Sequence, residues 1–505
     1  MHPTRREFLR LAGAAPLFTS LAGRGLAAAQ APVPESARRP LDVLVLMTDQ
    51  WNPYNLGYER DPDVHTPNLD ALAAQSLNFT NCYSNCPVCM PARTSFISGL
   101  LPHNTGLWGN ATDFYLPAGQ MPLFSDIRAR GYTTAQIGKL HWWSGNGYRR
   151  DHDSLAGYFK ALGLDHPEPV ATPFGTGGES GPYEDFLRRI GKLDTFVADM
   201  TRRLKEGQYA PSPAPVAPEE HNDWFVADRS IAFLGAQPRE KPYFLVTSFP
   251  GPHTPLDAMG RFLARYDPAK LRLAANVRPA ANGGRTFSVE DIRACRASYL
   301  GKITMIDECI GRIIATLKAR GTWDRTLVFF TADHGEMMGA HGKFGKGVFY
   351  EESARIPMLV RLPGQPNAGG RTDTPVHFGD VYGTAVEAVG GQVRKGRFTR
   401  SFLPFVRGEK LPPATAAFAE IQHQGTLNYM VRDRRHKWFI YGGKEHLYDL
   451  AEDPSELRNL IGSARHGDIA GNLKELQRQF ISSTQVNLSA DYVPLAQRVR
   501  EGKKR

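Results

Sequence analysis

Cysteine is scarce in this sequence. The 505 residues include five cysteines, and an odd number cannot all pair within one chain. Five cysteines in so long a chain do not make a disulfide framework, and this length allows a large hydrophobic core instead. The cysteines at positions 82, 86 and 89 lie close together, and they favour special chemistry over stapling.

Long hydrophobic runs are also missing beyond the first 31 residues. A helix needs about 20 apolar residues to span a bilayer, and no later run approaches that length. We therefore expect no stable insertion of the mature chain into a membrane. Internal repeats are not evident either.

The first 31 residues have a different character. Arg5 and Arg6 precede Phe8, a mildly apolar stretch follows, and small residues from Ala27 to Ala31 offer cleavage sites. This order resembles a twin-arginine export signal. It predicts a signal peptide over residues 1–31, the twin-arginine translocase as a partner, and a periplasmic or secreted mature protein.

The net charge is positive, at +10. The signal carries a net +3 of this, from four arginines minus Glu7, so the mature chain keeps about +7. Such a surplus favours anionic substrates by electrostatic steering. We expect no nucleic-acid partner.

Four short apolar runs each end in ionisable or polar residues. The runs "LDVLVLMTDQ", "YTTAQIGKLH", "PYFLVTSFPGPH" and "RTLVFFTADHGE" read as buried strands. Open α/β sheets build their sites past the carboxyl ends of their strands. The groups delivered there are Asp49 and Gln50, Lys139 and His141, His253, and Asp333 and His334.

Helical patterns alternate with these strands. The strongest predicts a helix over residues 289–319, with Ser288 and Asp291 spaced as a capping box and Gly321 as the stop. Cys295 and Cys309 lie fourteen positions apart on it, about 21 Å along a helix, so they cannot bond to each other. We interpret both as core residues.

The pattern of predicted elements changes after residue 395. Short strands separated by turns, then a terminal helix, predict a small antiparallel unit over residues 396–505, after a catalytic α/β domain over residues 40–395. The stretch 151–222, with its run "PSPAPVAPEE", reads as an irregular loop or insertion over the site.

The strand-end pairs at Asp49–Gln50 and Asp333–His334 favour a metal site. They offer carboxylate and amide oxygens with one imidazole, a set suited to a divalent cation such as Ca²⁺, Mg²⁺ or Mn²⁺. A turn or cap role would suffice for any single aspartate. Two such pairs at strand ends favour the metal.

Cys89 stands in the pattern C-x-P-x-R with Pro91 and Arg93. Structural zinc needs four ligands, and no second C-x-x-C or nearby C-x-x-H completes a set. A thioredoxin-like βαβ pattern, which a redox pair would need, is absent as well. Five cysteines give C-x-P-x-R by chance in roughly one chain in a hundred, so the pattern asks for its own explanation.

The segment "CMPAR" within "CPVCMPARTSFISGLLPHNTG" resembles the signature of the type I, formylglycine-dependent sulfatases of the alkaline-phosphatase-like superfamily. The similarity extends through "VLVLMTDQ", "GKLHW", "GPHTP", "FFTADHGEMMGAHGKFGKGVFYEESARIPMLV" and "HLYDLAEDPSELRNL", across most of residues 41–462. The resemblance implies a large mixed, mostly parallel α/β sheet flanked by helices, with a smaller C-terminal antiparallel sheet and helix. It also implies that a maturation enzyme oxidises Cys89 to Cα-formylglycine.

Site roles follow from this resemblance by motif position. Asp49, Gln50, Asp333 and His334 match the metal ligands, and an oxygen of the formylglycine at Cys89 joins them. Arg93 would hold the formylglycine oxygen, and Lys139 and Lys346 would clamp sulfate oxygens. His141 would assist release of sulfate and His253 would protonate the leaving alcohol. The implied reaction is hydrolysis of a sulfate monoester.

Two positions depart from the pattern of many sulfatases. Gln50 stands where an aspartate is common and His334 where an asparagine is common, a combination similar to the choline-sulfatase and phosphonate monoester hydrolase branches. Ca²⁺ is the expected ion, and the two substitutions leave Mn²⁺ and Mg²⁺ open. Cys82 and Cys86 have no role in this account.

Alternatives to a sulfatase stay open. A phosphonate monoester or phosphodiester hydrolase would share every motif, and a non-catalytic binding protein could keep the scaffold. A phosphatase with a hydroxyl nucleophile would place serine or threonine at position 89. The sequence leaves a sulfated glycan, a small alkyl sulfate and an aryl sulfate as candidate substrates.

Overall fold

The computed structural model describes residues 39–111, 114, 116–142, 152–171, 181–409 and 416–485. The predicted signal peptide, residues 1–31, lies outside these ranges. From Pro40 onward the chain forms one compact unit. None of the helices in the described ranges has the length and apolar character that crossing a bilayer requires.

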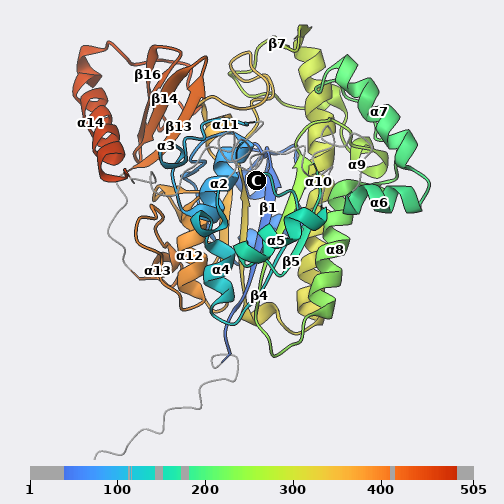
Figure 1. Cartoon of the computed structure of the whole chain (residues 1–505). Coiled ribbons are helices and arrows are strands. Elements are labelled where there is room, and N and C mark those ends of the chain that lie inside the picture. Colours follow the sequence, from blue (N-terminus) through green and yellow to red (C-terminus); the bar gives the residue numbers. More distant parts are fainter. Residues whose placement is uncertain are drawn as a thin grey trace, which may run out of the picture. The chain divides into compact units, whose positions relative to one another are not determined.

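A sheet of eight strands forms the centre of this unit (Figure 1). In order across the sheet, the strands are β11 (Arg371–Thr372), β2 (Leu77–Phe79), β10 (Met358–Arg361), β9 (Thr326–Ala332), β1 (Asp42–Asp49), β6 (Tyr243–Pro252), β4 (Thr133–Gly138) and β5 (His166–Pro169). Neighbours from β9 to β5 are parallel, whereas β10 runs antiparallel to β9 and β2. The predicted mixed, mostly parallel sheet is confirmed.

The central strands are buried along their whole length. Every residue of β1, β6 and β9 is buried, and Leu44 of β1 lies between Leu245 of β6 and Val328 of β9. Parallel strands that are covered on both faces lack the polar alternation of a half-exposed strand. This is why they appear in the sequence as continuous apolar runs.

Helices cover both faces of the sheet (Figure 1). On one face α8 (Asn222–Ala236) and α10 (Val289–Ala319) pack against β6 and each other; on the other lie α2 (Cys89–Ser98), α4 (Leu123–Arg128) and α12 (Asp380–Ala388). Other helices of this unit include α1 (Pro67–Ala73), α3 (Pro102–Thr105), α5 (His152–Leu162), α9 (Gly260–Ala264), α11 (Glu351–Ala354) and α13 (Leu403–Val406).

Helix α10 has the predicted bounds and the predicted capping box. Ser288 Oγ accepts a hydrogen bond from the Asp291 amide at 3.1 Å, and the Asp291 carboxylate accepts one from the Ser288 amide at 2.9 Å. Cys295 and Cys309 are fully buried on this helix. Their interpretation as core residues is confirmed.

The stretch 151–222 is more ordered than the predicted irregular loop. Among the described residues it contains helix α5 and strand β5, followed by two further helices, α6 (Pro182–Arg189) and α7 (Leu193–Glu206). Tyr183 of α6 and Phe196 of α7 are buried, and their rings meet edge-on with centroids 5.6 Å apart. The prediction was wrong because α6 and α7 bury apolar residues that recur at helical spacing, whereas the proline run that indicated a loop covers only residues 211–218.

A second sheet follows near the carboxyl end. Its four antiparallel strands are β13 (Ala417–His423), β14 (Thr426–Arg432), β15 (His436–Tyr441) and β16 (Lys444–Asp449), in that order. Helix α14 (Gly467–Ser483) packs on β14 and β15 and buries Leu473 with Trp438 and Leu447. The predicted antiparallel sheet with a helix is confirmed, while the domain boundary at residue 396 stays a prediction.

Two pairs of short strands complete the strands of the described residues. Strand β3 (Cys82–Tyr83) pairs in parallel with β12 (Val376–His377), and β7 (Ala280–Asn282) pairs antiparallel with β8 (Arg285–Phe287).

Candidate active site

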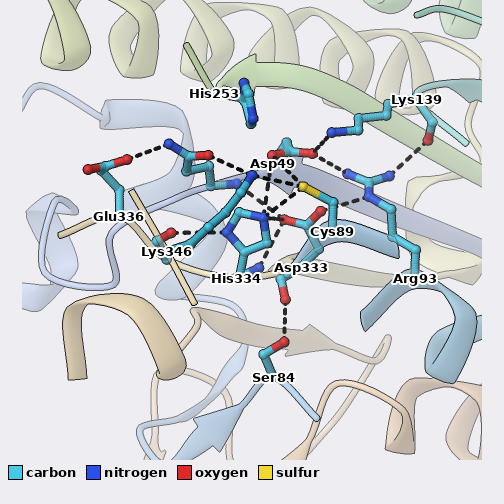
Figure 2. A network of polar contacts seen from close by, with 12 residues as sticks. Asp49, Ser84, Cys89, Arg93, Lys139, His253, Asp333, His334, Glu336 and Lys346 are labelled. Atoms are coloured by element: carbon cyan, nitrogen blue, oxygen red, sulfur yellow. Dashed lines mark hydrogen bonds and ion pairs between the residues drawn. The ribbon is translucent and has the colours of Figure 1, made fainter. Parts of the chain in front are cut away.

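The four strands that were predicted to carry the site are neighbours in the large sheet. They lie in the order β9, β1, β6, β4 and run parallel. Their carboxyl ends therefore meet at one edge, which brings Asp333, Asp49, His253 and Lys139 together. Helix α2 begins at the same edge with Cys89 (Figure 2).

Side chains with metal-binding atoms converge at this edge. Ligand atoms of Asp49, Cys89, Asp333 and His334 all lie within 4.8 Å of one another, and all four residues are buried. His334 Nε2 is 3.1 Å from Cys89 Sγ, 3.7 Å from Asp49 Oδ1 and 3.6 Å from Asp333 Oδ1. Carboxylate oxygens with one imidazole nitrogen fit a hard or borderline divalent cation.

The backbone fixes which nitrogen of His334 faces the cluster. His334 Nδ1 lies 3.0 Å from the Gly335 carbonyl oxygen, which can only accept, so Nδ1 carries the proton. Nε2 is then free to act as a ligand. A side chain on Gly335 would place its Cβ 1.9 Å from the Glu352 carbonyl oxygen, so only glycine allows the turn after His334 to lie this close to α11.

Gln50 lies beside the cluster with a defined amide orientation. Its Oε1 accepts a hydrogen bond from Lys346 Nζ at 2.9 Å. Its Nε2 donates to the hydroxyl of Tyr209 at 3.0 Å and to the carboxylate of Glu336. The amide oxygen therefore faces the cluster and the amide nitrogen faces away from it.

Arg93 ties the two aspartates to α2. Its Nε donates to Asp333 Oδ2 at 2.7 Å and its Nη2 to Asp49 Oδ2 at 3.1 Å. Nη1 donates to the Ser248 hydroxyl and the Lys139 carbonyl, both at 2.8 Å. With 1% of its surface exposed, the guanidinium is a buried charge that these bonds satisfy. Its predicted contact with an oxygen at position 89 stays a prediction.

The surroundings of Cys89 stabilise negative charge. Burial raises the pKa of this thiol, but Lys139, Lys346 and His334 outweigh burial and hold the pKa well below its ordinary value. Lys346 Nζ donates to Cys89 Sγ at 2.9 Å. The group at position 89 is thus placed where an anion is favoured.

The two predicted histidines also reach Cys89. Burial and Lys139 lower the pKa of His141, while a hydrogen bond with Cys89 opposes them. Burial and Lys346 lower the pKa of His253, again against a hydrogen bond with Cys89. The structure thus brings every predicted site residue to one place, and the roles assigned to them stay predictions.

The other two cysteines of the segment differ from Cys89. Cys82 and Cys86 are fully buried, and burial raises the pKa of both thiols well above the ordinary value. A thiolate is the reactive and metal-binding form of cysteine. Both residues therefore behave as inert parts of the core.

Some residues that support the site were missed from the sequence. Ser84 Oγ donates to the Asp333 carbonyl at 2.6 Å, and Ser248 accepts from Arg93. Glu336 and Tyr209 hold Gln50, and their hydroxyl-to-carboxylate hydrogen bond measures 2.7 Å. The acidic residue two positions after His334 was a usable signal for Glu336. Tyr209 lies 159 positions from Gln50, and no sequence pattern marks it.

A second group of metal-type side chains lies elsewhere, at His341, Glu352 and Glu456. Lys437 Nζ lies 2.5 Å from a carboxylate oxygen of Glu456. Asn276 Nδ2 donates to Glu352 at 2.7 Å. Because the protein itself supplies partners to these carboxylates, we assign this group a structural role and not a metal-binding one.

The sheet and its charged edge have the arrangement that the resemblance to the alkaline-phosphatase-like superfamily predicted. The model of the sulfatase family matches residues 41–391, more than half of the chain. A second model, described as N-sulphoglucosamine sulphohydrolase, C-terminal, matches residues 339–483. The chain belongs to the sulfatase family, which confirms the predicted family and enzyme class.

Known relatives cover most of the chain. It is 29% identical over 443 residues to an ulvan-active sulfatase of Formosa agariphila, covering 83% of this chain and 77% of the relative. It is 29% identical over 459 residues to a choline-sulfatase of Rhizobium meliloti, covering 84% and 83%. Among solved structures, the phosphonate monoester hydrolase of Agrobacterium radiobacter matches with a TM-score of 0.71 and 25% identity, covering 88% of this chain and 96% of that one.

Proposed function

We propose that this sulfatase hydrolyses a sulfate monoester to an alcohol and inorganic sulfate through a formylglycine made from Cys89. The position of Cys89 carries the proposal. It lies 2.9 Å from Lys346 Nζ and 3.1 Å from His334 Nε2, among buried groups that favour negative charge. A sulfate ester carries its charge into this setting and gains more on its oxygens as the ester bond breaks.

The nucleophile in this proposal is a hydrated aldehyde. Formed from Cys89 by a maturation enzyme, it supplies one hydroxyl that attacks sulfur and a second whose deprotonation releases sulfate and restores the aldehyde. A thiol lacks that second hydroxyl and could not release the sulfate. Cys89 is the first residue of α2, and the unpaired amides of a helix N-terminus favour an anionic group there.

A divalent cation completes the proposed site. Asp49, Gln50, Asp333 and His334 would hold it, with Ca²⁺ expected and Mn²⁺ or Mg²⁺ as alternatives. Such an ion neutralises charge on sulfate oxygens and lowers the pKa of the nucleophile. Arg93 holds both aspartates in place for it.

The remaining residues handle the sulfate and the protons. Lys139 and Lys346 would clamp sulfate oxygens, and Arg93 would hold the nucleophile oxygen. His141, kept neutral by its lowered pKa, would accept the proton of the second hydroxyl. His253 would give a proton to the leaving alcohol, since the negative substrate beside it raises the pKa of its imidazole.

The substrate is proposed to be a sulfated glycan or a small alkyl or aryl sulfate. One relative is named for activity on ulvan and another for choline sulfate. A second candidate function, hydrolysis of phosphonate monoesters or phosphodiesters, draws support from Gln50 and from the phosphonate monoester hydrolase structure.

Turnover of matched aryl esters tests the choice. The mature enzyme is assayed with an aryl sulfate, an aryl phosphonate and an aryl phosphodiester that share one leaving group, and then with defined sulfated sugars. We expect the highest kcat/KM for a sulfate ester. Preference for the phosphonate or the phosphodiester would contradict the proposal in favour of the second candidate.

Cellular context belongs to the same proposal. The C-x-P-x-R segment supports a formylglycine-generating maturation enzyme as a partner. The paired arginines near the amino terminus support export by the twin-arginine translocase to the periplasm or beyond.

A further inference from the structure

Glu336 is a fully buried carboxylate beside the site. It accepts hydrogen bonds from the Met338 and Gly345 amides, both at 2.8 Å, from the Tyr209 hydroxyl at 2.7 Å, and from Gln50 Nε2. All four donors are neutral groups. Burying a carboxylate costs free energy unless hydrogen bonds satisfy it. A buried carboxylate beside Gln50 therefore suggests a specific role.

Gln50 is held at both ends of its amide. The Lys346 ammonium has only protons to offer, so it requires the amide oxygen. Glu336 Oε1 accepts from the Met338 and Gly345 amides and Oε2 accepts from the Tyr209 hydroxyl, so the carboxylate presents an acceptor to Gln50 and requires its amide nitrogen. These two partners leave one orientation of the amide, with Oε1 on the side of Lys346 and Nε2 on the side of Glu336.

Tyr209 strengthens this arrangement from a distant loop. Its hydroxyl accepts from Gln50 Nε2 at 3.0 Å and donates to Glu336. Its ring packs on Phe344, with centroids 4.5 Å apart. The hydroxyl is thus held between the amide and the carboxylate.

We propose that Glu336 is a positioning residue for the cation of the proposed function, acting through Gln50. The amide that replaces a carboxylate at position 50 has a weaker oxygen ligand. Donation of Nε2 to Glu336 would leave Oε1 available as the cation's ligand and would increase the electron density on that oxygen. Glu336, which lies behind Gln50, would supply the negative charge that Gln50 itself lacks.

Calorimetric titration with Ca²⁺ and with Mn²⁺ tests this inference on the metal-stripped, full-length mature protein. In E336Q, the new amide nitrogen would oppose Gln50 Nε2, so the Gln50 amide must turn its nitrogen toward the cation. We expect the affinity to fall about 10- to 100-fold, the range for partners behind metal ligands. In the exchange variant Q50E/E336Q, the amide at position 336 would donate to the carboxylate at position 50, and we expect the affinity to return to the wild-type value.

Matched controls separate positioning from stability. E352Q changes another buried glutamate, bonded to Asn276 and not to Gln50, and we expect unchanged affinity. Melting temperatures of the metal-free variants check the fold. If E336Q does not fold, Y209F carries the test, because it removes one partner of Gln50 while the Glu336 carboxylate stays, and a weaker affinity is expected.

The outcomes distinguish the inference from the function on which it rests. Unchanged affinity in E336Q, or in Y209F where E336Q does not fold, overturns the inference alone. An equal loss in E352Q, or no recovery in the folded exchange variant, overturns it as well, since a merely structural role would give those results. A wild-type protein that binds neither cation overturns the metal site of the proposed function and this inference with it.

Discussion

Three cysteines within a few positions show how strongly the surroundings of one residue decide its chemistry. Burial raises the pKa of Cys82 and Cys86, and both stay inert thiols. Cys89 is just as buried, yet Lys139 and Lys346 reverse the direction of its pKa shift. The residue that the maturation enzyme would modify is the one that the structure surrounds with positive charge.

Replacement of His253 tests its proposed role as general acid. H253N keeps a polar group of similar size but cannot donate a proton to the leaving alcohol. We expect kcat for alkyl sulfates to fall roughly 10²- to 10⁴-fold, the usual size of general acid catalysis. Aryl sulfates with acidic phenols need little protonation and should lose far less. A uniform loss across a series of leaving groups would contradict the role.

The pH dependence of kcat tests the neutral His141. Burial and then Lys139 lower the pKa of His141. The wild-type imidazole therefore stays neutral at pH values below the ordinary pKa of histidine. In K139M the effect of Lys139 is gone, the pKa of His141 rises, and the acid limb of kcat should move to higher pH. Rate profiles of the two proteins measure the shift, and an acid limb that stays in place or moves to lower pH would speak against His141 as the base.

The first turn of helix α2 must both start a helix and carry the maturation signature. Cys89 is its first residue and Pro91 lies in its first turn, where the missing amide proton of proline costs nothing and its fixed φ suits the helix. The same residues form the C-x-P-x-R signature. Folding and maturation therefore make separate demands on Pro91.

The variant P91A separates these demands. We expect a loss of about 0.4–1 kcal/mol in stability, since alanine only adds freedom to the unfolded chain, but a large drop in the fraction of formylglycine at position 89. Mass spectrometry and thermal melting measure the two quantities. M90L, which changes a residue between the signature positions, is the control and should be fully modified. Full modification of P91A would contradict the signature role.

Local patterns in the sequence allow much of the fold to be predicted. The apolar runs of β1 and β9 and the capping box of α10 depend on neighbours along the chain, so they could be predicted. The adjacency of β9, β1, β6 and β4 depends on strand order, and only the general rule for α/β sheets and the family resemblance anticipated it. Tyr209 reaches Gln50 through a distant loop, and only the folded structure shows this contact.

Residues 1–31 of the whole chain bear on the compartment in which the enzyme works. The resemblance of residues 1–31 to a twin-arginine signal predicts export after folding. R5K/R6K should therefore leave the protein in the cytoplasm as an uncleaved precursor, because the signal is read through its paired arginines. Cell fractionation measures this. R10K is the matched control, and normal export of R5K/R6K would contradict the prediction.

The proposed reaction depends first on the chemical state of residue 89. Mass spectrometry of the mature protein, made together with a competent maturation enzyme, reads it directly from the peptide that contains position 89. We expect an aldehyde there, which a hydrazine reagent captures. An unmodified thiol in all of the protein would contradict this expectation.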